Sequence, residues 1–391
     1  MSDNNFDVVV YGASGFTGKL VVEYLHNQYG GEQNFSWALA GRSQEKLSSV
    51  RDELGISKDV PVLIVDSNDE SSVIEMVTQT KCVLTTVGPY QLYGQNIIKQ
   101  CALHGTDYVD LCGEPGWMHE MINEYSMQAE ETGARIVFSC GFDSIPFDLG
   151  VFFLQKEVIA NHGKPASSIR GRVRAMNGEF SGGTAASLGA TMASLKKKPE
   201  LFEVLANPFA LSNGFVGPEQ PRDHKPIFDE KLETWVAPFF MAPINTKNVH
   251  RSNALMGHMY GEDFCYNEMW IQGPGEEGKA AAEFVGKTNP LADAPEPGEG
   301  PSRESRENGN YDVLFCADLD DDSEVHASVA GDLDPGYGST SKMIAESAIC
   351  LVKECSDLKG GIYTPAPSMG EKLIARLEAN AGLTFKIEKN A

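Results

Sequence analysis

The segment VVVYGASGFTGKLVVEYL, residues 8–25, decides the fold class. Its apolar run ends at a glycine, glycine recurs at every third position, and a helical pattern follows. Glycines spaced in this way let backbone N–H groups at a helix N-terminus approach a pyrophosphate without hindrance from Cβ atoms. The segment therefore predicts a strand–loop–helix unit that binds a dinucleotide. Its expected contact residues are Gly12, Ala13, Ser14, Gly15, Phe16, Thr17 and Gly18.

The same alternation of apolar runs and amphipathic stretches continues through the first 150 residues. The expected strands are 7–12, 35–41, 60–66, 81–88, 107–113 and 134–141. The expected helices are 16–28, 43–54, 69–79, 95–104 and 115–132. Strands that are apolar throughout, and that alternate with helices, are typical of a parallel sheet covered on both faces. We therefore predict an α/β fold with a Rossmann-type, doubly wound parallel sheet.

The pattern changes after residue 150. A helix at 147–158 is followed by strand-like runs without regular helices, at 170–176, 313–319 and 324–331. This predicts a second, α+β domain with an antiparallel sheet. Residues 292–309 are rich in proline, glycine and charge, which predicts a mobile surface loop. Helices are expected again at 339–354 and 371–382. The predicted division is a nucleotide-binding domain at 1–150, a second domain at 151–335 and returning C-terminal helices at 336–391.

Charge and composition limit the kinds of partner. The net charge of -23 disfavours nucleic acid and anionic membranes, because both repel a negative surface. The polar, acidic start lacks a signal-peptide pattern, and no apolar run reaches the roughly 18 residues of a spanning helix. The eight cysteines form no CxxC motif, which indicates buried free thiols and no metal site. We expect a cytoplasmic protein.

The end of the second predicted strand indicates which dinucleotide binds. An NAD site places an acidic residue there for the ribose 2′-hydroxyl, but this strand ends in Gly41, Arg42 and Ser43. Glu32 has the usual spacing from the glycine loop, yet it precedes the strand. A guanidinium group and a hydroxyl suit a 2′-phosphate instead. The sequence therefore predicts NADP(H) as the cofactor.

Two other strand ends are expected beside the cofactor, because ligands bind outside the carboxyl ends of such strands. The fourth strand leads into Val87, Gly88, Pro89 and Tyr90, which we expect near the nicotinamide ribose. The candidate proton donors in the crevice are Tyr90, Tyr93, Glu114 and Asp143. Three of them have a competing interpretation. In that interpretation Tyr90 is an aromatic wall, Glu114 is an exposed loop carboxylate, and Asp143 or Ser144 caps the following helix.

Two further patterns bear on the substrate, and they favour different classes of substrate. Arg170, Arg172 and Arg174 share one face of a predicted strand, where they form either a clamp for a dicarboxylate or the solvated face of a sheet. The apolar run WVAPFFMAPI (235–244) forms either a pocket for an acyl chain, or core, or a dimer interface. The sequence alone leaves both choices open.

Motifs along nearly the whole chain resemble the saccharopine-dehydrogenase-like oxidoreductases, which include the trans-acting enoyl reductases. The motifs are YGASGFTG (11–18), AGRS (40–43), VGPYQLYG (87–94), C-x3-GTDYVDLCGE (101–114), CGFDSIPFDLG (140–150), SGGT (181–184), DPGYGSTSKM (334–343) and GGIYTPA (360–366). The resemblance implies an NADP-binding Rossmann domain, an inserted second domain and C-terminal helices that return to the first. It also implies that the second domain supplies the substrate pocket and a homodimer contact.

The expected function is therefore that of an NADP(H)-dependent oxidoreductase acting on a small-molecule or acyl-chain substrate. By resemblance, the first choice of reaction is reduction of an enoyl-type C=C bond, and the second is a saccharopine-type imine/amine reaction. A third hypothesis is a sensor or scaffold that binds NADP(H) without turnover. Consumption of NADPH with the right substrate separates the two enzymes from the third.

Overall fold

The structure is a computed structural model that describes residues 5–142, 144–179, 182–288, 295 and 298–388. These residues form two seven-stranded sheets. The strands of the first sheet, in spatial order, are β13 (Gly361–Tyr363), β6 (Arg135–Val137), β5 (Asp107–Val109), β4 (Thr80–Thr85), β1 (Phe6–Tyr11), β2 (Trp37–Gly41) and β3 (Val62–Ile64). All neighbouring pairs are parallel, which confirms the predicted Rossmann-type sheet.

Helices cover both faces of this sheet. They are α1 (Phe16–Tyr29), α2 (Gln44–Glu53), α3 (Glu70–Thr78), α4 (Tyr90–Tyr93), α5 (Gln95–His104) and α6 (Pro115–Thr132). Val8 and Val10 face the side of α1 and α2, while Val9 faces the side of α3, α5 and α6. All three valines are fully buried, which explains the continuous apolar run in the middle of β1.

The second sheet is mixed. In spatial order its strands are β14 (Leu383–Glu388), β12 (Glu324–Gly331), β11 (Asn310–Asp318), β7 (Ser168–Asn177), β10 (Cys265–Gly273), β9 (Thr234–Pro238) and β8 (Ile227–Asp229). β7 and β10 are parallel and the other pairs antiparallel, so the prediction of an antiparallel sheet was wrong for this pair. A parallel pair requires a long crossover, and the chain between β7 and β10 is long enough to provide it.

Further helices follow residue 144, and several of them lie between strands of the second sheet in the sequence, so the expectation of strand-like runs without regular helices was wrong. They are α7 (Ile145–His162), α8 (Gly182–Lys197), α9 (Leu201–Ala206), α10 (Ala242–Leu255), α11 (Gly275–Val285), α12 (Arg303–Glu307), α13 (Thr340–Glu354) and α14 (Pro365–Arg376). Helix α12 lies within the predicted mobile loop, so the loop prediction was wrong there. Ser302 caps this helix by accepting a hydrogen bond from the Ser305 amide at 3.0 Å, which gives the segment a defined start.

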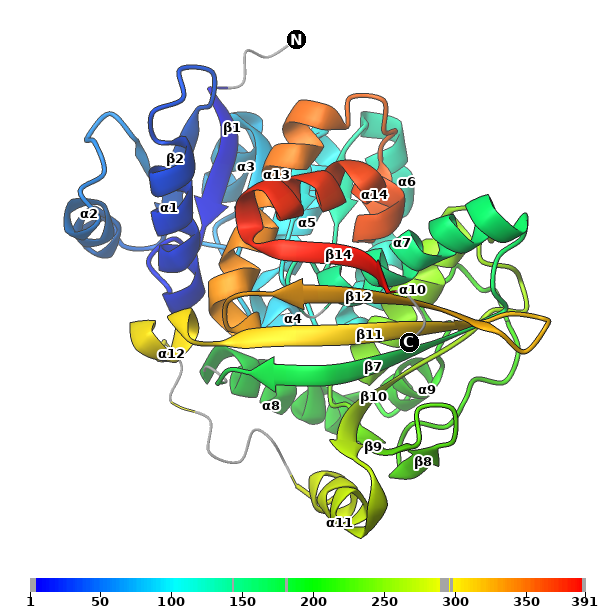
Figure 1. The fold of residues 1–391 in the computed structure, drawn as a ribbon. Coiled ribbons are helices and arrows are strands. Elements are labelled where there is room, and N and C mark those ends of the chain that lie inside the picture. Colours follow the sequence, from blue (N-terminus) through cyan, green and yellow to red (C-terminus); the bar gives the residue numbers. More distant parts are fainter. Residues whose placement is uncertain (1–4, 143, 180–181, 289–294, 296–297, 389–391) are drawn as a thin grey trace.

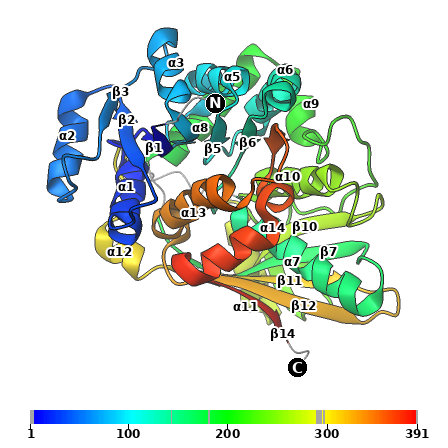
Figure 2. The same ribbon diagram turned by 90° about the horizontal axis from the view of Figure 1, so that it is seen from above.

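The C-terminal helices lie between the two sheets (Figures 1 and 2). Helix α13 packs against α1, β1, β4 and β5, while α14 packs against α13 and α7. Helix α7 in turn covers β11 and β12. The last described strand, β14, belongs to the second sheet, because it pairs with β12.

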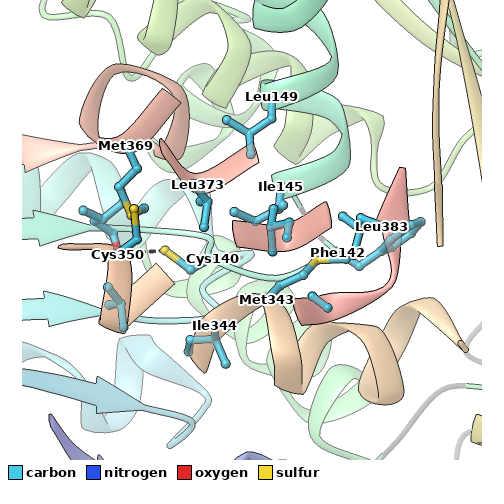
Figure 3. Close-up of a cluster of buried hydrophobic side chains, with 14 of the residues drawn as sticks. Cys140, Phe142, Ile145, Leu149, Met343, Ile344, Cys350, Met369, Leu373 and Leu383 are labelled. Atoms are coloured by element: carbon cyan, nitrogen blue, oxygen red, sulfur yellow. Dashed lines mark hydrogen bonds between the residues drawn. The ribbon is translucent and has the colours of Figure 1, made fainter. Parts of the chain in front are cut away.

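An apolar core fills the space where these helices meet (Figure 3). Its labelled side chains come from α7, α13 and α14, from the segment after β6 and from the start of β14: Cys140, Phe142, Ile145, Leu149, Met343, Ile344, Cys350, Met369, Leu373 and Leu383. All eight cysteines are free thiols and seven are buried, as predicted; Cys265 is partly exposed. Among the described residues, no helix combines the length and the apolar character that crossing a membrane requires.

Candidate active site

The loops after β1 and β4 meet at the point where the strand order of the first sheet reverses. Gly12 has a positive φ of 92°, which favours glycine. A Cβ atom there would lie 2.6 Å from Val87 Cγ2 and 2.9 Å from Thr86 Oγ1. The two loops are therefore in direct contact, and they flank the crevice in which this fold binds dinucleotides.

The glycine loop leads directly into the N-terminus of α1. Gly15 precedes the helix, and no side chain caps the first turn. A Cβ atom on Gly18 would lie only 2.1 Å from the Gly12 carbonyl oxygen, so only glycine permits this close packing of helix and loop. Uncapped N–H groups at the positive end of a helix dipole suit a pyrophosphate. The cradle therefore fits the phosphates of a dinucleotide.

Arg42 and Ser43 follow β2 directly. The Arg42 side chain is exposed, and the Ser43 hydroxyl accepts a hydrogen bond from the Lys46 amide at 3.3 Å, which caps α2. The strand end thus carries a cation and a helix N-terminus, and both attract an anion. This donor set suits a ribose 2′-phosphate.

Tyr90 lines the crevice, but its hydroxyl is used within the protein. The hydroxyl donates to the Thr85 carbonyl at 3.1 Å and accepts from the Leu111 amide at 3.0 Å. Burial raises the pKa of this phenol well above its usual value. The side chain joins the ends of β4 and β5 and presents its ring to the crevice. This geometry favours the aromatic-wall interpretation over that of a proton donor.

Glu114 is buried, so the interpretation as an exposed loop carboxylate was wrong. Its two oxygens accept hydrogen bonds from the Tyr90 and Gln91 amides, both at 2.9 Å, and so hold the start of α4. Gln91 also donates its side-chain amide to Glu114 at 2.9 Å and to Thr191 at 3.2 Å, and it accepts from Ser194. Glu114 therefore positions α8 through Gln91, and its geometry does not favour direct proton transfer.

The remaining catalytic candidates lie at the start of α7. Asp143 lies outside the described residues. Ser144 occupies the N-cap position, but its side chain forms no capping bond. Its hydroxyl accepts instead from Asn248 Nδ2 at 2.7 Å, so the capping interpretation was wrong for this side chain. Tyr93, on α4, is 39 % exposed and does not line the crevice.

A cavity of about 530 Å³ lies beside the cofactor loops. Thr17, Thr86 and Gly88 form its wall on the side of the first sheet. The opposite walls come from α8 and from the segment that leads into α10, and they are mainly apolar. These lining residues include Leu188, Met192, Leu195, Phe240, Met241, Pro243 and Ile244. The run at 235–244 thus contributes four residues to a cavity, which favours the pocket interpretation over plain core.

Only two of the described lining residues are charged, Glu179 and Lys247. Lys247 lies on α10 and is 3 % exposed. Its Nζ atom donates to the Pro243 carbonyl at 3.0 Å, and burial lowers its pKa to about 8. Sequence reasoning missed this residue. The available signal was the segment APINTKNVHRSNAL (242–255), which is polar and yet is buried almost throughout.

The three arginines of β7 do not line the cavity, which argues against a substrate clamp. Arg172 is 2 % exposed, so the solvated-face interpretation was wrong for it. Carboxylates from neighbouring strands form ion pairs with all three arginines and so balance their charges. Arg170 binds Asp229 and Glu324, Arg172 binds Asp229, and Arg174 binds Asp312 and Glu388.

Comparison with known proteins decides the family. Residues 8–137 match the saccharopine dehydrogenase NADP binding domain. The chain is 36% identical to a putative trans-acting enoyl reductase of Mycobacterium tuberculosis, over 99% of this chain and 98% of that protein. The chain belongs to the saccharopine-dehydrogenase-like family of the trans-acting enoyl reductases. A second member of the family, the trans-acting enoyl reductase of Mycobacterium ulcerans, is 33% identical over 96% of each chain.

The fold of the family agrees with this assignment. Apo saccharopine dehydrogenase from Saccharomyces cerevisiae superimposes with a TM-score of 0.57, covering 99% of this chain and all of that chain at 11% identity. The resemblance that the motifs indicated is confirmed. The protein is an NADP-dependent oxidoreductase of the saccharopine-dehydrogenase-like family.

Arg42→Ala is expected to weaken NADPH binding by about 10- to 150-fold, because we propose that Arg42 forms a charged hydrogen bond with the 2′-phosphate, which is worth about 1.5–3 kcal/mol. NADH binding should stay the same. Fluorescence titration with both nucleotides measures the preference. Lys58→Ala, which removes an exposed cation just beyond the other end of α2, is the matched control. An equal loss of NADPH and NADH affinity in the Arg42 variant would exclude recognition of the 2′-phosphate by this residue.

Proposed function

We propose that the protein reduces a C=C bond conjugated to the carbonyl group of an acyl chain, with NADPH as the reductant. The observation that carries this proposal is the apolar cavity that adjoins the cofactor loops. Its volume lies within the range of about 300–1,000 Å³ that is typical of small-molecule sites. An acyl chain can lie against α8 and the 240–244 segment while its head group reaches Thr17 and Thr86.

The exposed apolar side chains of α8 support an acyl substrate. Leu188 and Met192 line the cavity, yet they are 44 % and 53 % exposed. A bound hydrocarbon chain would remove this apolar surface from water, which is favourable by roughly 25 cal/mol per Å². Gln91 donates a hydrogen bond to Thr191 and accepts one from Ser194, and these two bonds hold α8 against the first domain and keep this wall in place.

The charges of the cavity favour an enoyl substrate over a saccharopine-type one. An amino-dicarboxylate substrate needs several cations, since unpaired carboxylates are costly to bury. Lys247 is the one cation among the described lining residues, and Glu179 would repel a carboxylate. Bound NADPH supplies a hydride for the reduction. The protein supplies an apolar cradle for the chain and a single cation for a polar head group.

The test is consumption of NADPH with defined acceptors. A medium-chain 2-enoyl thioester should oxidise NADPH, whereas a 2-oxo acid mixed with an amino acid should not. Met192→Glu should raise the KM for the thioester about tenfold or more, because it places a charge against the hydrocarbon chain. Met127→Glu, at a 69 % exposed position on α6, is the matched control and should leave the KM unchanged. Turnover with the 2-oxo acid mixture alone would overturn the proposal, and binding without any turnover would favour the sensor.

A further inference from the structure

Lys247 occupies the substrate cavity without a carboxylate partner. Among the described residues its Nζ atom has one hydrogen-bond acceptor, the Pro243 carbonyl, and forms no ion pair. An ammonium group has three N–H donors, and its burial is costly unless those donors are paired. The fold therefore retains a cation that destabilises it, at the wall of the one site where a substrate is expected. Such an arrangement is typical of functional groups.

The groups around Lys247 balance its positive charge only weakly. The opposing charge that acts on it is that of Asp223, which precedes β8 and forms no ion pair with Lys247 within the described structure. Other ionisable groups lie on the elements around α10, and none forms a salt bridge with Lys247. They are His250 and Arg251 on α10, Asp148 on α7, Tyr266 and Glu268 on β10, Arg172 on β7, and His224. The neighbour Glu268 accepts hydrogen bonds from Asn245 at 2.8 Å and Tyr266 at 2.9 Å, so its carboxyl group is already engaged.

We propose that Lys247 is a catalytic residue whose ammonium group donates a hydrogen bond to the carbonyl oxygen of the bound acyl group and stabilises the negative charge that forms there. This inference rests on the proposed function, because it assigns a role in the same cavity. One donor of Lys247 remains on Pro243, and the other two can reach into the cavity. The residue thus acts as an oxyanion-stabilising group.

The chemistry needs only the substrate, NADPH and a proton from water. With NADPH bound, its hydride would form a C–H bond at the β carbon and leave NADP+, and the π electrons of the C=C bond move toward the carbonyl. The oxygen then carries negative charge as an enolate, beside the Lys247 ammonium group. The enolate collapses when its α carbon takes a proton from water, which restores the carbonyl. Lys247 keeps its proton throughout, and the net change is the addition of a hydride and a proton across the C=C bond.

Binding of unreactive ligands tests this role without the cofactor. Octanoate carries a negative oxygen at the end of an apolar chain, whereas octan-1-ol has the same chain without the charge. Isothermal titration calorimetry of the full chain should show octanoate binding about 10- to 150-fold more weakly to Lys247→Met than to the wild type. Octan-1-ol should bind both proteins equally. Lys247→Arg, which keeps the charge, should recover part of the octanoate affinity.

The pH dependence of octanoate binding gives a second readout. The pKa of Lys247 is lowered to about 8 by burial, so the ammonium form predominates below that pH and is lost above it. Octanoate stays ionised over this range, so its affinity for the wild type should fall about tenfold or more between about pH 6.5 and about pH 9.5. The Lys247→Met variant should show no such fall. Lys196→Met removes an exposed cation on α8 beside the cavity, and it should behave like the wild type.

The outcomes separate the two proposals. If octan-1-ol does not bind the wild type, the acyl cavity itself is wrong, and the proposed function fails with it. If octan-1-ol binds and Lys247→Met retains octanoate affinity with the wild-type pH dependence, the role of Lys247 is overturned while the cavity stands. Equal losses of octanoate affinity in Lys247→Met and Lys196→Met would also overturn it, because a general surface charge would then explain the effect.

Discussion

Asp229→Asn is expected to lower the free energy of unfolding by about 3–5 kcal/mol, because it leaves two arginines of the second sheet without their shared carboxylate. Asp229 accepts from Arg170 Nη1 at 2.7 Å and from Arg172 Nε at 2.8 Å. Asp229 is 6 % exposed and Arg172 is 2 % exposed, so water cannot replace the lost partner. Urea unfolding followed by circular dichroism measures the change.

The pH dependence of stability gives an independent check of the same ion pairs. Burial alone would raise the pKa of Asp229, but the charges and hydrogen bonds of Arg172 and Arg170 outweigh it and hold the pKa below 3.8. The folded protein therefore binds this proton less readily than the unfolded chain does. The stabilisation is present above the unfolded pKa and is lost as the pH falls through the lowered folded pKa. The acid-side decline of stability should be shallower in Asp229→Asn than in the wild type.

Two variants sharpen the comparison. Asp312→Asn removes one carboxylate from the partly exposed Arg174, which keeps Glu388, and should cost less than about 1 kcal/mol. Adding Arg172→Met to Asp229→Asn should restore part of the stability, because it removes the buried arginine that has lost its carboxylate, while Arg170 still pairs with Glu324. A loss for Asp229→Asn no larger than that for Asp312→Asn would contradict the buried-pair argument.

Gly18→Val is expected to remove measurable NADPH binding and to lower the free energy of unfolding by about 3 kcal/mol, the upper end of the usual cost of overpacking. The new Cβ atom would lie 2.1 Å from the Gly12 carbonyl oxygen and 2.7 Å from the Gly12 carbonyl carbon. Both are backbone atoms, so α1 has to move away from β1, and the phosphate cradle opens with it. NADPH fluorescence titration and thermal denaturation measure the two effects.

The control for this variant is Gly31→Val. Gly31 lies in the turn after α1, and a Cβ atom there would meet nothing within 4 Å. It makes the same chemical change near the same helix, and it should bind NADPH like the wild type. Wild-type affinity in Gly18→Val would mean that the loop tolerates a displaced helix, and that the close contact does not shape the phosphate site.

The first sheet could be predicted from the sequence because its strands are buried on both faces. Such strands carry apolar residues at consecutive positions, as at Val8 to Val10, and the helices between them are amphipathic. The seventh strand, β13, could not be predicted because it has three residues and joins the sheet from more than 200 residues away. A short edge strand carries too little pattern to separate it from a loop.

The candidate site was predictable only in part, for a related reason. Glycine spacing and the strand end at Arg42 are local features, so the cofactor loop could be located from the sequence. The burial of Glu114 and of Lys247 depends on tertiary contacts. The buried Glu114 carboxylate accepts hydrogen bonds from backbone amides at the start of α4, and Lys247 lies on a polar helix that the fold buries. Polar residues buried through hydrogen bonds leave no hydrophobic periodicity. The parallel pairing of β7 and β10 also depends on distant segments.

The pairing of the last two strands has a consequence for synthesis of the protein. β13 forms one edge of the first sheet and β14 one edge of the second. Until residues 361–388 have left the ribosome, β6 and β12 each present an unpaired edge, and unpaired edges recruit other strands. Both sheets are thus completed only after residues 361–388 have been synthesised. Until then the eight-residue strand β12 is the edge that β14 later covers, so a nascent chain halted before residue 361 should depend on chaperones more than a chain that contains β14 does.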